Sequence, residues 1–296
     1  MRPSALIMAV LVFALLIGAS APGRQAKKSD KLKIASSASL LRGADADKVE
    51  TAKAALRSLV RQEVNYDSEI FIEPDIARIA ELVDKKEFDL GAFQGYEFAW
   101  MREKHPKLRP LAIAINDQRQ LFAHVMVRQD SPAADFAGLK GQPVSIPDLS
   151  QGHCRLFIER QCLAAGLPPE KFFSKIVSPD NVEDALDDVV EGVVAATAVD
   201  KLAFDAYKRR KPGRFARLKE LVRSPPFPPN VVVYLPGHLT ETTLKEFKDG
   251  MINANQKAEG RRVLELWKHT AFEDVPQDYE KQLEAVRKAF PPLEKK

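Results

Sequence analysis

The sequence predicts an α/β protein of two lobes, each built on a mainly parallel sheet flanked by helices. Two observations predict it: strands and helices alternate along two successive stretches of the chain, and polar or proline-rich segments separate these stretches. The length of 296 residues, with 45% hydrophobic and 29% charged residues, is that of an ordinary folded protein. Composition therefore excludes disordered, collagen-like and coiled-coil chains.

The first stretch alternates strand and helix in a βαβαβ order. Its second helix, at 75–86, places Ile76, Ile79, Ala80 and Val83 on one face. Asp47 and Glu50 resemble a capping box at the start of the first helix. The predicted strands are 32–36, 70–72, 88–93, 111–115 and 122–127, and the predicted helices are 47–63 and 75–86.

The second stretch repeats the alternation. Its clearest helix, 179–191, has Ser178 as the expected N-cap and Gly192 as its end. The predicted strands are 143–146, 172–177, 193–198 and, after prolines at 224–229, 231–235. The predicted helices are 155–164, 179–191, one from 200, 240–255, 259–269 and 277–289.

The N-terminus has the layout of a secretory signal peptide: Arg2, an apolar run at 6–17 and small residues at 19–21. We expect cleavage after Ala21, followed by a polar linker at 22–31. An uncleaved anchor is the alternative, although a twelve-residue run is short for a span. Cleavage leaves 275 residues and lowers the net charge from +4 to +3, because Arg2 is the only charge removed.

Three loops follow predicted strands, where α/β sheets bind their ligands. They contain Ser36 and Ser37, then Gln94 and Tyr96, and finally Ser150, Gln151, Gly152 and His153. Hydroxyls, amides and free backbone N–H groups at these points suit an oxyanion. The alternative for each serine cluster is a turn or cap without a ligand, and for His153 a surface position near a helix start.

Catalysis has little support in the sequence. Cys154 adjoins His153, but neighbours on a helix point about 100° apart, which suits proton transfer poorly. GxSxG, HExxH, Walker and GxGxxG motifs are absent from the sequence. We expect no catalytic residues, no metal site and no cofactor. Cys154 and Cys162 are expected to be buried thiols, unless a helix break lets them form a disulfide.

A basic run extends from Lys208 to Lys219, with Tyr207 and Phe215 among the charges. This run could bind phosphate or an anionic membrane surface. The alternative, a solvated loop and helix face, is favoured because Pro212 and Gly213 interrupt the run and acidic residues flank it. The modest net charge also argues against a nucleic-acid partner.

Five segments, in this order, resemble the phosphate-, phosphite- and phosphonate-type solute-binding proteins of ABC transporters. They are 88–96 (FDLGAFQGY), 125–131 (VMVRQDS), 136–145 (FAGLKGQPVS), 166–173 (GLPPEKFF) and 189–200. The resemblance covers about residues 32–255 and implies a type II periplasmic-binding fold, with ligand held between two lobes. The crossings between lobes would fall near 116–120 and 224–229. The implied division is 32–118 with 228–296 as the first lobe and 119–227 as the second.

The resemblance also implies roles for site residues. Tyr96 matches an aromatic that contacts the phosphonate, and Thr197 and Asp200 end a strand that supplies residues of the cleft. The hydroxyl-rich loop of the family is reduced here to Ser150, so His153 is a possible cationic replacement.

The sequence thus predicts an exported, monomeric protein of the periplasm or cell envelope. It would capture a small anionic, phosphonate- or phosphate-like solute for an ABC permease in the inner membrane. The alternatives are a sensory or interaction module with the same fold and, less favoured, an enzyme with Cys154 as nucleophile.

Overall fold

The computed structural model describes residues 31–147 and 151–292. The predicted signal peptide (1–21) and all of the linker except Lys31 lie outside this range. Among the described residues, no helix is long and apolar enough to cross a membrane.

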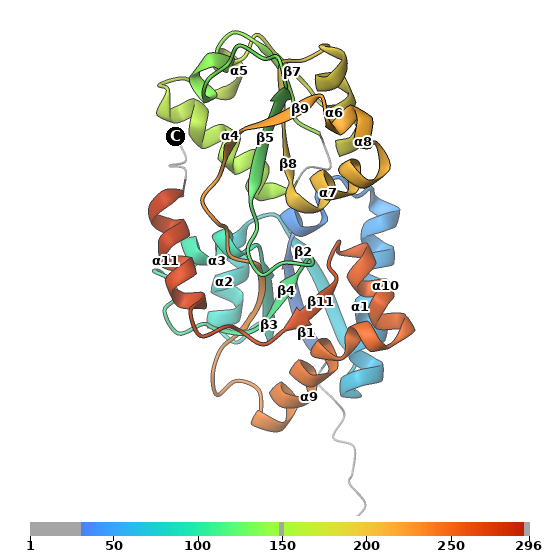
Figure 1. Cartoon of the computed structure of the whole chain (residues 1–296). Coiled ribbons are helices and arrows are strands. Elements are labelled where there is room, and N and C mark those ends of the chain that lie inside the picture. The colour runs from blue at the N-terminus through green and yellow to red at the C-terminus, as the bar shows by residue number, and fades with distance from the viewer. Residues whose placement is uncertain (1–30, 148–150, 293–296) are drawn as a thin grey trace, which may run out of the picture. The chain divides into compact units, whose positions relative to one another are not determined.

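A six-stranded sheet takes its strands from both ends of the described chain, in the order β11-β4-β10-β3-β1-β2 (Figure 1). Its strands are β1 (Leu32–Ser37), β2 (Ser68–Glu73), β3 (Leu90–Phe93), β4 (Arg109–Ile115), β10 (Asn230–Tyr234) and β11 (Ala271–Glu273). The carboxyl ends of β1 and β3 lie together, because both pair in parallel. The loops that follow these two strands therefore meet at one edge.

Helices cover both faces of this sheet. One face packs against α1 (Ala46–Val64), α9 (Glu241–Ile252) and α10 (Ala258–Leu266). The other packs against α2 (Ile76–Asp84), α3 (Gly95–Met101) and α11 (Tyr279–Ala289). The short 3₁₀ helices Ala38–Leu41 and Ala254–Gln256 belong to the same part of the chain.

A five-stranded sheet has the order β7-β6-β8-β5-β9. Its strands are β5 (Ala123–Arg128), β6 (Pro143–Ser145), β7 (Lys175–Val177), β8 (Ala196–Asp200) and β9 (Leu218–Arg223). Its helices are α4 (Gly152–Ala164) and α5 (Pro169–Phe172) on one face and α6 (Val182–Glu191), α7 (Lys201–Arg210) and α8 (Pro212–Phe215) on the other, with a 3₁₀ helix at Phe136–Leu139. The predicted fold class is confirmed: the protein is α/β, with two separate sheets that are each flanked by helices.

The expectation of mainly parallel sheets needs correction, because both sheets are mixed. β10 runs antiparallel to β3 and β4, and β5 runs antiparallel to β8 and β9. The chain enters the five-stranded sheet through β5 and returns to the six-stranded sheet through β10. Each of these strands runs opposite to its neighbours in the sheet that it joins. Only strands joined by a helical crossover within one sheet pair in parallel.

Several predicted boundaries were also wrong. Helix α6 begins after Asn181, whose Oδ1 accepts from the N–H of Asp184 at 2.8 Å, and not at Pro179. Helix α1 is capped by Asp45 instead of a box at Asp47. Helix α5 occupies the start of a predicted strand, and α3, β9 and β11 were not predicted.

Two chain segments run between the sheets side by side. The N–H of Leu121 donates to the carbonyl oxygen of Phe227 at 2.9 Å, and the reverse bond is 2.8 Å long. Next to this bridge, Phe227 stacks on Phe290 and meets Tyr96 edge to face. An aromatic cluster thus anchors the crossing segments to α3 and to the end of α11.

Candidate functional site

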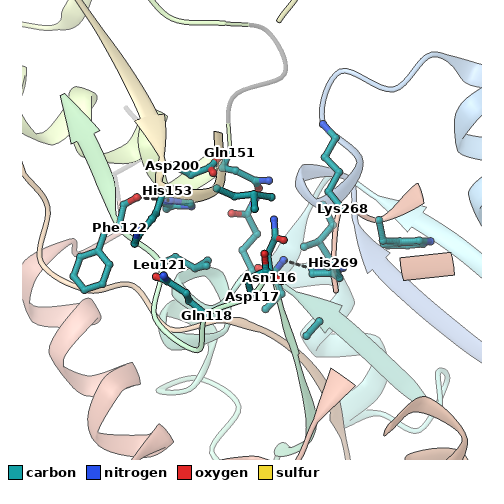
Figure 2. Close-up of a pocket in the computed structure, with 18 of the residues that line it drawn as sticks. Asn116, Asp117, Gln118, Leu121, Phe122, Gln151, His153, Asp200, Lys268 and His269 are labelled. Carbon is teal, nitrogen blue, oxygen red and sulfur yellow. Dashed lines mark hydrogen bonds between the residues drawn. The ribbon is translucent and has the colours of Figure 1, made fainter. Parts of the chain in front are cut away.

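A pocket of about 90 Å³ is lined by residues of both sheets and of the crossing segment at 116–122 (Figure 2). From the six-stranded side come Ser39, Leu40, Arg42, Gln94, Ala114, Asn230, Trp267, Lys268 and His269. From the five-stranded side come Gln151, Gly152, His153, Asp200, Lys201, Leu202, Asp205 and Arg209. The crossing segment adds Asn116, Asp117, Gln118, Gln120, Leu121 and Phe122.

The loops after β1 and β3 are joined by a polar network. The Gln94 amide Nε2–H donates to the carbonyl oxygen of Ser39 at 3.2 Å, and the hydroxyls of Ser37 and Ser39 lie 2.8 Å apart. Glu97 Oε2 accepts from the Gln94 N–H at 3.1 Å, and burial raises the pKa of the Glu97 carboxyl. This network fixes Ser39 and Gln94 in the pocket wall.

Helix α4 begins at the pocket. Its N-cap residue, Gln151, makes no side-chain cap bond, and the N–H groups of Gly152 and His153 have no backbone partner among the described residues. Free N–H groups in the first turn of a helix attract anions. Gly152 itself leaves no room for a side chain, because a Cβ there would lie 2.5 Å from Gln94 Nε2 and 2.7 Å from the Tyr96 hydroxyl.

His153 is buried, which corrects the expectation of a surface position. Its Nε2–H faces the carbonyl oxygen of Phe122 at 3.3 Å, and burial lowers the pKa of its imidazole. The ring is therefore a neutral group that holds α4 against the crossing segment. The hypothesis of a cationic His153 is not supported by this environment.

Four cationic side chains and three carboxylates line the pocket. Lys201 pairs with Asp205 at 2.6 Å, and Asp200 caps α7 by accepting from the N–H of Ala203 at 2.9 Å. Arg42, Arg209 and Lys268 have no ion-pair partner within 31–147 and 151–292. The carboxylates of Asp117 and Asp200 line the same pocket. Burial lowers the pKa of Lys268, and the charge of Asp200 offsets this only in part.

Asn230 and His269 form a second polar contact in the wall. Asn230 Nδ2–H donates to His269 Nε2 at 2.8 Å, and burial lowers the pKa of His269 to about 4. Because Nε2 is the acceptor, the neutral ring carries its proton on Nδ1. That N–H has no hydrogen-bond partner among the described residues.

The structure brings five of the predicted site residues together in the pocket wall. They are Gln94, Gln151, Gly152, His153 and Asp200. Ser36, Ser37, Tyr96 and Thr197 are buried and do not line this pocket. Ser150 lies outside the described residues, and the predicted ligand contacts remain predictions.

The four residues outside the pocket wall have other surroundings. Ser37 caps the 3₁₀ helix, and the Tyr96 hydroxyl packs behind Gly152, with a pKa raised by burial. Thr197 lies opposite Ser145 in the β6–β8 pair, and its hydroxyl has no partner among the described residues. The resemblance pointed to strands that end near the pocket, but it did not predict which side chains at those ends face the pocket.

Sequence reasoning missed Arg42, Asn230, Lys268 and His269. Arg42 comes three residues after the predicted serine loop, so an extension of that loop would have included it. Lys268 and His269 follow α10, within a helix predicted at 259–269, and their loop leads into the unpredicted strand β11. The segment at 116–120 was interpreted as a crossing, whereas Asn116, Asp117, Gln118 and Gln120 also line the pocket.

The cysteines and most of the basic run lie outside the pocket. Cys154 and Cys162 are free and buried in a continuous α4, and burial raises the pKa of both thiols. In the basic run, Lys211 and Arg214 pair with Asp187, both at 2.6 Å. Within the described ranges, no group of three or more His, Cys, Asp or Glu residues is placed to hold a metal ion.

Two sheets, two paired crossing segments and a polar pocket between them define a two-lobed solute-binding protein. A model of the family "ABC transporter, phosphonate, periplasmic substrate-binding protein" matches residues 40–279. The chain belongs to this family. No curated protein matches the sequence.

Solved structures show the same fold at low identity. A Xanthomonas citri protein bound to ATP has a TM-score of 0.61 and 15% identity, with 88% of this chain and 97% of that chain covered. PhnD1 of Prochlorococcus marinus with methylphosphonate has a TM-score of 0.57 and 16% identity, with 87% and 97% covered. A binding component of a Pseudomonas aeruginosa ABC phosphonate transporter has a TM-score of 0.55 and 16% identity, with 88% and 87% covered.

Proposed function

We propose that this protein captures a small oxyanion, phosphonate- or phosphate-like, in the pocket between its two sheets and presents it to an ABC permease of the inner membrane. Family membership supports the transport role. The binding of methylphosphonate by the similar PhnD1 supports the ligand class. The observation that carries the proposal is the convergence on one pocket of three cations, Arg42, Arg209 and Lys268, that have no ion-pair partner in the described part of the chain.

The physical argument rests on charge that is not neutralised within the protein. Two guanidinium groups, Arg42 and Arg209, remain charged at any physiological pH and bind oxyanions through paired N–H donors. Lys268 adds an ammonium group. The N–H groups of Gly152 and His153, which have no backbone partner among the described residues, extend this set with uncharged donors at the start of a thirteen-residue helix.

The volume of the pocket favours a small ligand. The pocket offers about 90 Å³ to water-sized groups, which is room for several of them. A phosphonate with a short substituent has this size, whereas a nucleotide such as ATP is far larger. The volume of the pocket therefore favours a phosphonate over ATP.

We further propose that the ligand is released by separation of two lobes, 32–118 with 228–296 and 119–227. The strand content of the two sheets supports this division. In the described chain, the backbone passes from one lobe to the other only through the two segments that pair at Leu121 and Phe227. Such short crossing segments are the expected hinge. Export to the periplasm by a signal peptide, action as a monomer and the absence of a nucleic-acid partner belong to the same proposal.

Binding without catalysis is also part of the proposal. A thiol nucleophile needs a lowered pKa, and burial raises that of Cys154. His153, its neighbour in sequence, contacts the carbonyl oxygen of Phe122, and it forms no hydrogen bond with the thiol among the described residues. These two groups therefore lack the arrangement of a nucleophile and its base.

Calorimetry with inorganic phosphate, methylphosphonate, methanesulfonate and ATP tests the proposal. We expect at least one of the three small anions to bind and ATP to give no heat. Arg42→Gln should weaken binding of that anion by roughly tenfold or more, which is the value of a charged hydrogen bond. Arg78→Gln, a matched change of an exposed arginine in α2, should leave it unchanged. Absence of binding by all small anions, with the protein folded, would refute the proposed function.

A further inference from the structure

A buried carboxyl group lies behind the wall of the pocket. Glu97, in the first turn of α3, is 5% exposed, and it forms no ion pair in the part of the chain that the structure describes. Carboxylates are seldom buried in this way without a paired cation. The capping-box bond of Glu97 to the N–H of Gln94 does not explain the charge, because a glutamine at this position caps a helix equally well.

Glu97 is linked to the pocket through the loop that follows β1. Ser39 lines the pocket, its hydroxyl oxygen lies 2.8 Å from that of Ser37, and either hydroxyl can donate to the other. Burial, the largest effect, raises the pKa of Glu97, while hydrogen bonds from the Ser39 hydroxyl, the Gln94 N–H and the Ser37 hydroxyl lower it. The ionised carboxyl therefore depends on donors that belong to the pocket wall.

The charged group that acts on Glu97 most strongly is Arg42. Its guanidinium favours the ionised carboxyl, and it also lines the pocket. An anion in the pocket would share this cation and would add a second negative charge near the carboxylate. Both changes favour protonation of Glu97, since like charges in a poorly solvated site cannot both be held at low cost.

The other titratable groups around α3 are neutral or engaged elsewhere. Burial raises the pKa of Tyr96 on α3 and of Tyr279 on α11, and it lowers that of His153 on α4. The remaining groups on α4 and α7 are Cys154, Glu159 and Asp200. The charges between α3 and the helices α2 and α11 pair with one another: Arg102 with Glu280, Glu103 with Arg287, and His105 with Asp84.

We propose that capture of the anion is coupled to uptake of one proton by Glu97, which turns the Ser39 hydroxyl from the carboxyl to the anion. This inference rests on the proposed function. The proton comes from solvent and binds a carboxylate oxygen of Glu97. The new O–H group donates to Ser39 Oγ, so the hydroxyl proton of Ser39 is free to donate to an anion oxygen. Glu97 is thus a positioning residue, because it acts on the anion only through Ser39.

Calorimetry with inorganic phosphate, methylphosphonate and methanesulfonate, each from about pH 5.5 to about pH 8.5, tests the coupling. Glu97→Gln is the central variant, since its neutral amide can accept from Gln94 and donate to Ser39 as the protonated acid would. Titration of the ligand or of other pocket residues occurs in both proteins and cancels in the ratio of their affinities. That ratio, wild type over variant, should fall about tenfold or more as pH rises, because binding must then supply the proton to Glu97.

Two further variants complete the test. Ser39→Ala removes the hydroxyl that connects Glu97 to the anion, so it should weaken binding about tenfold at low pH and lose the wild-type pH dependence. Glu246→Gln makes the same change as Glu97→Gln at an exposed position of α9 and should keep the wild-type profile.

The outcomes separate this inference from the proposed function. A constant or rising ratio in Glu97→Gln, with circular dichroism unchanged, would overturn the coupling and leave the proposed function intact. Retention of the wild-type pH profile by Ser39→Ala would also overturn it, and this comparison decides alone if Glu97→Gln does not fold. Binding of none of the three anions would overturn both.

Discussion

The two walls of the pocket hold their charges differently. On the five-stranded side, Lys201 is paired with Asp205, and Asp200 caps α7, so in the described part of the chain Arg209 is the pocket cation of this side without a carboxylate partner. On the six-stranded side, Arg42 and Lys268 both lack an ion-pair partner among the described residues. Under the proposed function, the six-stranded wall would supply most of the charge that attracts an anion, while the five-stranded wall would supply helix N–H groups.

The largest expected effect comes from the contact between the walls at Gly152. Gly152→Ala places a Cβ within about 2.7 Å of the Gln94 amide and the Tyr96 hydroxyl, so the walls cannot approach as closely. We expect anion affinity to fall about 100-fold with little change in circular dichroism. Gly213→Ala, where a Cβ meets nothing within 4 Å, is the control. Wild-type affinity in Gly152→Ala would mean that closure does not need this contact.

The next effect compares single charges of the two walls. Lys268→Met should weaken anion binding roughly 10- to 30-fold, because it removes a charged donor from the wall with most free charge. Arg209→Met should cost about threefold or less, since the neighbouring Lys208 and Arg210 keep positive charge at this position. Lys53→Met, in a pair with Glu50 at 2.7 Å on α1, serves as the control in the same titration. Equal losses in the first two variants would contradict the unequal roles of the walls.

A smaller effect concerns stability of the six-stranded wall against acid. The pKa of His269 is lowered to about 4 in the folded protein, against about 6.5 when unfolded. The unfolded chain therefore binds more protons between these values. The free energy of unfolding should decrease as pH falls from about 6.5 to about 4, by about 1 kcal/mol for this partly exposed ring, and His269 adds no further loss below pH 4.

Denaturant titrations across this pH range, without added anion, measure the decrease. His269→Gln should flatten the pH profile. An identical slope in the variant would show that the pKa of His269 is the same in the folded and unfolded protein.

The smallest effect is expected on the thiols of α4. Burial and a raised pKa keep Cys154 protonated, so iodoacetamide should label it at least about 100-fold more slowly than in the unfolded protein. Mass spectrometry of timed samples measures the rate. Rapid labelling of native Cys154 would reopen the interpretation of this residue as a nucleophile.

The sequence predicted the fold class because helix stripes such as Ile76, Ile79, Ala80 and Val83 are local patterns. It did not predict that β5 and β10 run antiparallel to their neighbours, since strand direction depends on how the chain passes between sheets. The short strand β11 and the seven-residue helix α3 carry too few residues for a periodic signal.

The candidate site was predicted in part for a similar reason. Loops after β3 and before α4 were found because they follow strands, which led to Gln94, Gln151 and Gly152. Lys268 and His269 reach the pocket from the other end of the chain, through the return to the six-stranded sheet. Whether Tyr96 faces the pocket or packs behind Gly152 depends on the turn of α3, a helix that the pattern did not reveal.

The positions of the two tryptophans give the molecule a built-in optical readout. Trp267 lies in the wall of the pocket, whereas Trp100 is held in the aromatic cluster by a 2.7 Å hydrogen bond to the carbonyl oxygen of Phe290. These are the only indole fluorophores in the chain. In Trp100→Phe, emission would come from Trp267 alone, so its wavelength and quenching would follow occupancy directly. The complementary Trp267→Phe would leave a fluorophore that senses the crossing segments, and the pair would separate filling from motion without an added dye.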